Sequence, residues 1–179
     1  MVIWGNGGCY ADGGTTYQRF LWQVASYGVM FISPGTILGE SNRGRTNATW
    51  MTGAIDWITK AAGKGNYTHV DPSRIAVWGQ SCGGTEALAN AQDPRISSVG
   101  VFDSGSRTEA DSKAIVGKIS KPVFYFIGGV SDSAYPNVSL TTGSRATQFR
   151  LTPTIRLNAT IFHFQQRHQL GRAITTEVI

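Results

Sequence analysis

Residues 75–84 read Ile-Ala-Val-Trp-Gly-Gln-Ser-Cys-Gly-Gly and carry the most informative local pattern of the chain. The apolar first half of this stretch is typical of a buried strand, and the residues after the Gly-Gly pair favour a helix that ends at Asn90. Between the strand and the helix, residues 79–83 fit the pattern G-x-S-x-G, which places Ser81 on a tight, strained turn. The small residues two before and two after Ser81 would let neighbouring backbone approach. The stretch therefore predicts a strand-turn-helix unit with Ser81 at its apex.

The rest of the first 136 residues alternates in the same way between apolar strands and helices. Continuously apolar strands that are separated by helices indicate a mainly parallel sheet covered on both faces, which is the α/β class. The Gly-rich segment 5–14 is expected to be a loop, because glycine is costly inside regular elements. The expected strands cover residues 2–4, 29–32, 75–78, 99–102 and 122–127, and two further helices cover residues 17–26 and 49–62.

The composition changes near residue 136. Of the 179 residues, 41% are hydrophobic, so the chain can bury a sizeable core, and its length suits one domain. Residues 1–136 hold 11 Lys or Arg and 10 Asp or Glu, whereas residues 137–179 hold five Arg, no Lys and one acid. We expect an α/β core over 1–136 and an atypical Arg- and Thr-rich tail over 137–179. Val138-Ser139 can be encoded by a spliceosomal donor site, so our hypothesis is that this tail is non-native or poorly ordered.

Several function classes find no support in the sequence. No apolar run approaches the ~20 residues that a membrane span needs, so we expect none. Four of the five net positive charges lie in the tail, without the aromatic platform of a nucleic-acid binder, so we expect no nucleic-acid partner. Tyr10 breaks an incomplete G-x-G-x-x-G, and the chain has no P-loop, H-E-x-x-H or C-x-x-C motif. We therefore expect no cofactor and no metal, and no signal peptide is visible after Met1.

Three segments resemble those of α/β-hydrolases. Residues 70–84 resemble the VD-x-x-RIAV-x-G-x-S-x-GG segment of that superfamily. Residues 4–9, Trp-Gly-Asn-Gly-Gly-Cys, look like its third strand and oxyanion loop, with Asn6 where many members carry His. Residues 128–132 are similar to the turn that bears the catalytic acid. The resemblance covers about residues 2–136 and is greatest to small fungal secreted esterases of the dienelactone-hydrolase and cutinase-like branch.

The resemblance implies an α/β-hydrolase fold and a serine-dependent carboxylic ester hydrolase that works through an acyl-enzyme intermediate. Ser81 would be the nucleophile at the nucleophile elbow, and the backbone N–H of Cys82 would be one donor of the oxyanion hole. Gly7 or Gly8 would supply the second donor. The substrate would be a small-molecule or polymeric ester.

The acid and the base of a catalytic triad would come from other segments. Asp132 is the expected acid, and Asp103, after the preceding strand, is its rival. His69 precedes the strand that leads to the serine, so we expect it at the opposite edge of the sheet. His163 has a strand-like context, His168 has less in its favour, and the Gly-rich loop that carries the family's histidine is absent. The alternative function is therefore a catalytically inactive α/β-hydrolase fragment that lacks the triad His.

The resemblance also brings the two cysteines together. It makes the strands before Cys9 and Cys82 neighbours, so we predict a disulfide between them, with two buried free thiols as the alternative. The chain also holds four N-glycosylation sequons, at Asn47, Asn66, Asn137 and Asn158. These features predict a secreted, extracellular glycoprotein. The first expected strand resembles the third strand of the family, so we expect the family's first two strands to be missing.

Overall fold

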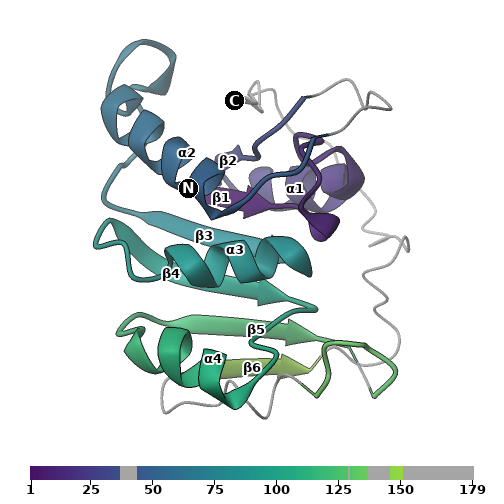
Figure 1. The fold of residues 1–179 in the computed structure, drawn as a ribbon. Coiled ribbons are helices and arrows are strands. Elements are labelled where there is room, and N and C mark those ends of the chain that lie inside the picture. The colour runs from purple at the N-terminus through teal and green to yellow at the C-terminus, as the bar shows by residue number, and fades with distance from the viewer. Residues whose placement is uncertain (37–43, 129, 137–145, 151–179) are drawn as a thin grey trace.

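The computed structural model describes residues 1–36, 44–128, 130–136 and 146–150. In this part of the chain, six parallel strands form one sheet in the order β2-β1-β3-β4-β5-β6 (Figure 1). A parallel sheet with helical crossovers is the α/β class that the sequence predicts. The strands are β1 (Val2–Gly5), β2 (Phe31–Ile32), β3 (Ile75–Gln80), β4 (Ile96–Phe102), β5 (Val123–Ile127) and β6 (Ala146–Arg150).

Helices cover both faces of the sheet. Ile3 of β1 packs into a core with α2 and α3, whereas Val2 and Trp4 pack with α1 on the other face. This alternation is the period of two that a strand imposes, and it explains why every residue of β1 is buried. Figure 1 shows α3 and α4 in front of the sheet. The helices are α1 (Gln18–Ala25), α2 (Ala48–Ala61), α3 (Cys82–Asn90) and α4 (Glu109–Ile115).

Two elements were not among those expected from the sequence. Helix α4 has few apolar residues, and a cap defines its start, because the Thr108 hydroxyl accepts a hydrogen bond from the Asp111 N–H at 3.1 Å. Strand β6 falls within the tail expected over 137–179, and its backbone pairs with β5 in parallel register. The strand-like context of His163 lies outside the described residues.

The loops that follow four of the strands meet at one edge of the sheet. Strands β1, β3, β4 and β5 are parallel neighbours, so their carboxyl ends lie side by side. Three non-glycine residues of the described ranges have a positive φ, and each follows one of these strands: Cys9 at 52°, Ser81 at 52° and Asp103 at 44°. Such backbone conformations cost about 1–3 kcal/mol each and tend to cluster at functional sites. The carboxyl edge of the sheet is therefore the place to look for a site.

Candidate active site

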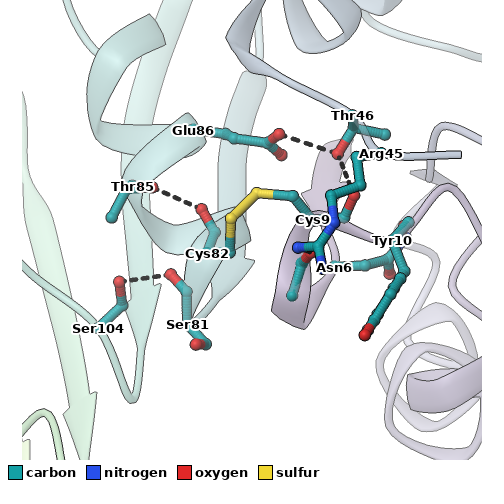
Figure 2. The surroundings of a disulfide bond; sticks show 11 residues. Asn6, Cys9, Tyr10, Arg45, Thr46, Ser81, Cys82, Thr85, Glu86 and Ser104 are labelled. Carbon is teal, nitrogen blue, oxygen red and sulfur yellow. Dashed lines mark hydrogen bonds between the residues drawn. A yellow bond between two sulfur atoms is a disulfide. The ribbon is translucent and has the colours of Figure 1, made fainter.

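Ser81 lies at the turn between β3 and α3, as the sequence predicts. Its backbone has φ 52° and ψ −118°, a strained region for a residue with a Cβ, and the residue is exposed. The Ser81 N–H donates to the Phe102 carbonyl at 2.9 Å, and the Ser104 hydroxyl donates to the Ser81 carbonyl at 2.6 Å (Figure 2). The end of β4 and the loop after it therefore hold the turn in its strained form.

Two glycines allow the backbone to pack closely around this turn. A Cβ on Gly83 would lie 2.1 Å from the backbone of Gly5, and a Cβ on Gly79 would lie 2.2 Å from the carbonyl oxygen of Gly83. No side-chain carbon can sit that close to fixed backbone atoms, so both positions require glycine. The two glycines of the G-x-S-x-G motif thus let the ends of β1 and β3 contact the first turn of α3.

The first turn of α3 presents backbone N–H groups next to Ser81. The Ser81 carbonyl accepts hydrogen bonds from the N–H groups of Gly84 at 3.0 Å and Thr85 at 3.3 Å. Cys82 is the first residue of the helix, so its N–H has no acceptor within the helix. That N–H and the positive end of the helix dipole would stabilise a negatively charged oxygen beside Ser81.

A disulfide between Cys9 and Cys82 fastens the loop after β1 to this helix start (Figure 2). The predicted pairing is therefore confirmed, and the alternative of two free thiols is wrong. The two Cα atoms are 5.2 Å apart, within the usual range for a disulfide, because β1 and β3 are adjacent in the sheet. The bond joins the expected oxyanion loop to the residue after the expected nucleophile.

Glu86, one turn further along α3, is buried near this disulfide (Figure 2). Its carboxyl group lies 2.8 Å from the Thr46 hydroxyl oxygen, which lies 3.2 Å from the Cys9 carbonyl oxygen. Burial raises the pKa of Glu86. The Thr46 N–H also donates to the Cys9 carbonyl, at 2.8 Å, so the single proton of the Thr46 hydroxyl can go to Glu86. The hydrogen bond with Thr46 acts on the pKa of Glu86 in the direction opposite to burial. Glu86 therefore joins α3 to the segment that carries Thr46 through a buried polar contact.

The loop after β1 is fixed by a hydrogen bond between two of its own residues and by contact with Tyr17, just before α1. Asn6 is buried, and its side-chain amide donates to the Tyr10 carbonyl at 3.0 Å. Gly8 has φ 64°, a conformation that favours glycine. A Cβ on Gly7 would lie 2.3 Å from the Tyr17 hydroxyl oxygen, so Tyr17 packs directly against this loop.

Tyr17, at the end of a short 3-10 helix (Thr15–Tyr17), links this loop to the residue before Ser81. Its ring packs edge-on against Trp4 with the ring centres 5.2 Å apart, and its hydroxyl donates to Gln80 Oε1 at 2.6 Å. Burial raises the pKa of Tyr17, so the hydroxyl keeps its proton. Gln80 also interacts with the Asp103 carboxyl group, and this interaction acts to lower the pKa of that group.

The two rival acids, Asp103 and Asp132, lie together and are hydrogen-bonded to each other. Asp132 accepts hydrogen bonds from the backbone N–H groups of Gly128 and Ala134, each at 2.8 Å. The Asp103 N–H donates to the Phe126 carbonyl at 2.8 Å, which fixes Asp103 beside the end of β5. Burial, and then the contact with Asp132, raises the pKa of Asp103 to about 7. Two carboxyl groups in contact share one proton more readily than they ionise together.

Of the three histidines, only His69 lies among the residues that the structure describes. His69 lies in the exposed segment before β3, so it is at the opposite end of that strand from Ser81, as predicted. His163 and His168 lie outside the described residues. The structure thus brings together the expected nucleophile, the oxyanion loop and both candidate acids at one edge of the sheet.

Arg45 is a residue beside the site that sequence reasoning missed. Its guanidinium donates to the Gly8 carbonyl at 2.7 Å and lies 5.1 Å from the centre of the Tyr10 ring (Figure 2). Backbone pairing between Tyr10 and Arg45 brings the two segments together. No motif predicts this contact, because it joins two loops that are distant in the sequence.

No protein-family model matches the chain, and no curated protein matches it. Among the described residues, no group of three or more His, Cys, Asp or Glu side chains could hold a metal ion. No helix of these ranges is long and apolar enough to cross a membrane. A function for the site must therefore be inferred from its own geometry.

Proposed function

We propose that this chain is a serine-dependent carboxylic ester hydrolase with an α/β-hydrolase fold and that Ser81 is its nucleophile. The observation that carries the proposal is the strained backbone of Ser81 at the start of α3. A turn with a purely structural role would be served better by glycine, which adopts a positive φ at no steric cost. A serine that is kept there at a cost of about 1–3 kcal/mol is best explained by chemistry of its hydroxyl group.

In the proposed reaction, Ser81 Oγ attacks the carbonyl carbon of the ester while a general base takes the hydroxyl proton. The alcohol leaves with that proton, and the acyl group stays on Ser81. Water then attacks the acyl-enzyme, which releases the carboxylic acid and restores the hydroxyl group. The base would be His163 or His168, and Asp132 would be the acid that orients it.

The oxyanion of each tetrahedral intermediate would be stabilised by two backbone N–H groups. One is that of Cys82, at the first position of α3. The second would be that of Gly7 or Gly8, in the loop after β1. Each donor would lower the barrier by on the order of 3 kcal/mol, so the disulfide that fixes the relative positions of the two loops supports the proposed mechanism.

We further propose that the protein is secreted and acts on a small-molecule or polymeric ester rather than on nucleic acid. The Cys9–Cys82 disulfide is typical of an oxidising compartment. The sequon residues Asn47 and Asn66 are both exposed. Asn47 caps α2 through its side-chain oxygen, which accepts from the Thr49 N–H at 2.9 Å, so a glycan on its nitrogen would be compatible with the cap.

The test compares this chain with Ser81→Ala in p-nitrophenyl acetate and butyrate hydrolysis and in labelling by a fluorophosphonate probe. We expect the wild-type chain to turn over ester and to be labelled at Ser81, and the variant to do neither. Equal turnover in the two chains would contradict the proposal and would favour the inactive fragment. Circular dichroism of both chains controls for folding.

A further inference from the structure

The loop that would supply the second oxyanion donor is rich in glycine. Residues 5–8 include three glycines, and Gly8 has φ 64°. Glycine has the least restricted backbone of all residues, so such a loop loses much conformational entropy when it adopts a single conformation. An oxyanion donor is effective only if it is oriented before the reaction begins. The loop therefore depends on contacts with other segments to keep its N–H groups in place.

Residues 44–46 pair in antiparallel orientation with the end of this loop. The Ala11 N–H donates to the Gly44 carbonyl at 2.9 Å, and the Thr46 N–H donates to the Cys9 carbonyl at 2.8 Å. These two backbone bonds hold the part of the loop that begins at Cys9. The glycines that precede Cys9 lie outside this backbone pairing.

The Arg45 side chain extends the pairing to the glycines. Its guanidinium donates to the Gly8 carbonyl at 2.7 Å. The N–H of the same peptide unit, that of Cys9, donates to the Asn6 carbonyl at 3.0 Å. The peptide unit between Gly8 and Cys9 is therefore held at both ends. Because a hydrogen bond from a charged donor is roughly twice as strong as one between neutral groups, Arg45 provides a strong restraint.

Tyr10 keeps the guanidinium of Arg45 beside this peptide (Figure 2). The guanidinium carbon lies 5.1 Å from the centre of the Tyr10 ring, within the range of a cation–π contact. A Cβ on Gly8 would lie 2.6 Å from the same ring, so the ring packs directly against Gly8. Arg45 is exposed, and no ion pair within the described ranges involves it. Neither core packing nor a carboxylate partner therefore accounts for its position.

We propose that Arg45 is a positioning residue that fixes the orientation of the Gly8–Cys9 peptide and thereby of the oxyanion donor in this loop. The use of the donor in catalysis rests on the proposed function, whereas the restraint on the loop does not. Rotation of this peptide changes the backbone angles at Gly8, and with them the direction of the N–H group that would bind the oxyanion. Loss of Arg45 should therefore slow attack on the ester and leave substrate binding nearly unchanged.

The experiment replaces Arg45 in the full chain and measures fluorophosphonate labelling of Ser81, together with kcat and KM for p-nitrophenyl acetate. We expect Arg45→Ala to slow labelling and to lower kcat by on the order of tenfold, with KM and the free energy of unfolding nearly unchanged. Methylguanidinium in the buffer should restore much of the rate, because the position of the lost guanidinium is open to solvent. Arg45→Lys keeps a charged donor and should lose less than Arg45→Ala.

Arg74→Ala is the matched control. Arg74 is an exposed arginine just before β3, at the opposite end of that strand from Ser81. Its replacement removes the same charge, so this variant should react like the wild type with or without methylguanidinium. Unchanged labelling in Arg45→Ala, or an equal loss in Arg74→Ala, would overturn the inference. A loss that neither methylguanidinium nor Arg45→Lys reduces would also overturn it, because the bond to Gly8 would then not be its cause.

Amide hydrogen exchange provides a readout that requires no activity. The Cys9 N–H should exchange faster in Arg45→Ala than in the wild type, and its exchange should be unaffected in Arg74→Ala. If Ser81 is labelled in none of the chains, the proposed function fails, and the exchange of the Cys9 N–H alone decides whether Arg45 restrains the loop. Equal exchange of this N–H in the wild type and in Arg45→Ala would show that it does not.

Discussion

Cys9 and Cys82 are separated by 73 positions in the sequence and are joined by a disulfide at the carboxyl edge of the sheet. One half follows β1 and the other is the first residue of α3, so the bond spans the two segments that would form the oxyanion hole. A crosslink of this span restricts the unfolded chain strongly, with a loop-closure contribution of about 4 kcal/mol in the entropic description. The disulfide therefore stabilises the fold and fixes the distance between two proposed donors.

Removing both cysteines tests this contribution. We expect Cys9→Ala/Cys82→Ala to lower the free energy of unfolding by about 2–4 kcal/mol, as measured by urea titration. Wild-type protein treated with reductant should lose a similar amount, and the double variant should be insensitive to reductant. A double variant as stable as the oxidised wild type would show that the bond contributes nothing to the fold.

Close backbone packing around Ser81 makes a second prediction. Gly83→Ala would place a Cβ 2.1 Å from the backbone of Gly5. We therefore expect this variant to lower the free energy of unfolding by about 3 kcal/mol or to prevent folding. Gly53→Ala is the matched control, because Gly53 is exposed within α2 and its Cβ would meet nothing within 4 Å. The control should gain about 0.5–1 kcal/mol from helix propensity. Similar effects at the two positions would contradict the packing argument.

Local patterns predicted the sheet well, because its strands carry their own signal. Strand β1 is buried at every position and β3 at its first three, and that burial requires apolar side chains. Strand β5 alternates between buried and half-buried residues, all of them apolar or aromatic. The G-x-S-x-G turn was recognisable for the same reason, since only glycine fits at Gly79 and Gly83. In such elements the local sequence and the tertiary packing impose the same demand.

The parts that sequence reasoning missed depend on tertiary contacts or on caps. Helix α4 is defined by the Thr108 cap rather than by an apolar face, and the T-x-x-D pattern at Thr108 and Asp111 was the signal that could have revealed it. The contact of Arg45 with Gly8 and the pairing of Asp103 with Asp132 join separate loops. The spacing of residues in the sequence does not indicate contacts between separate loops. Asp103 and Asp132 were therefore treated as alternative acids, whereas in the structure they lie near each other.

The pH dependence of stability provides a third prediction. Glu86 and Asp103 both have a folded pKa above the ordinary values of 4.5 and 3.8, so the folded chain binds more protons than the unfolded chain between about pH 4 and pH 7. Their stabilising effect is complete below the unfolded pKa values and is lost as the pH rises through the folded ones. We therefore expect the free energy of unfolding to fall from about pH 4 to pH 7, as measured by urea titration at each pH.

Two other acids set the lower limit of that window. Hydrogen bonds lower the pKa of Asp71 and Asp93, so their contribution has the opposite sign and is lost only as the pH falls below about 4. The variants Asp103→Asn and Glu86→Gln replace the raised groups with neutral side chains. Each should flatten the decline above pH 4, and the double variant should abolish most of it. If the free energy of unfolding falls equally steeply in the double variant, groups other than Asp103 and Glu86 cause the fall and the prediction is wrong.

The strain at Ser81 allows a final prediction that separates fold from chemistry. Ser81→Gly removes the Cβ that makes φ 52° costly, whereas Ser81→Ala keeps the Cβ and removes only the hydroxyl group. Neither variant can form an acyl-enzyme, so both should lose fluorophosphonate labelling and ester turnover. We nevertheless expect the free energy of unfolding of Ser81→Gly to be about 1 kcal/mol larger than that of Ser81→Ala. Glycine relieves the backbone strain of the folded state, and this gain exceeds the loss caused by the greater entropy of glycine in the unfolded chain. If Ser81→Gly is instead the less stable of the two, the turn stores no strain, and the observation that carries the proposed function loses its force.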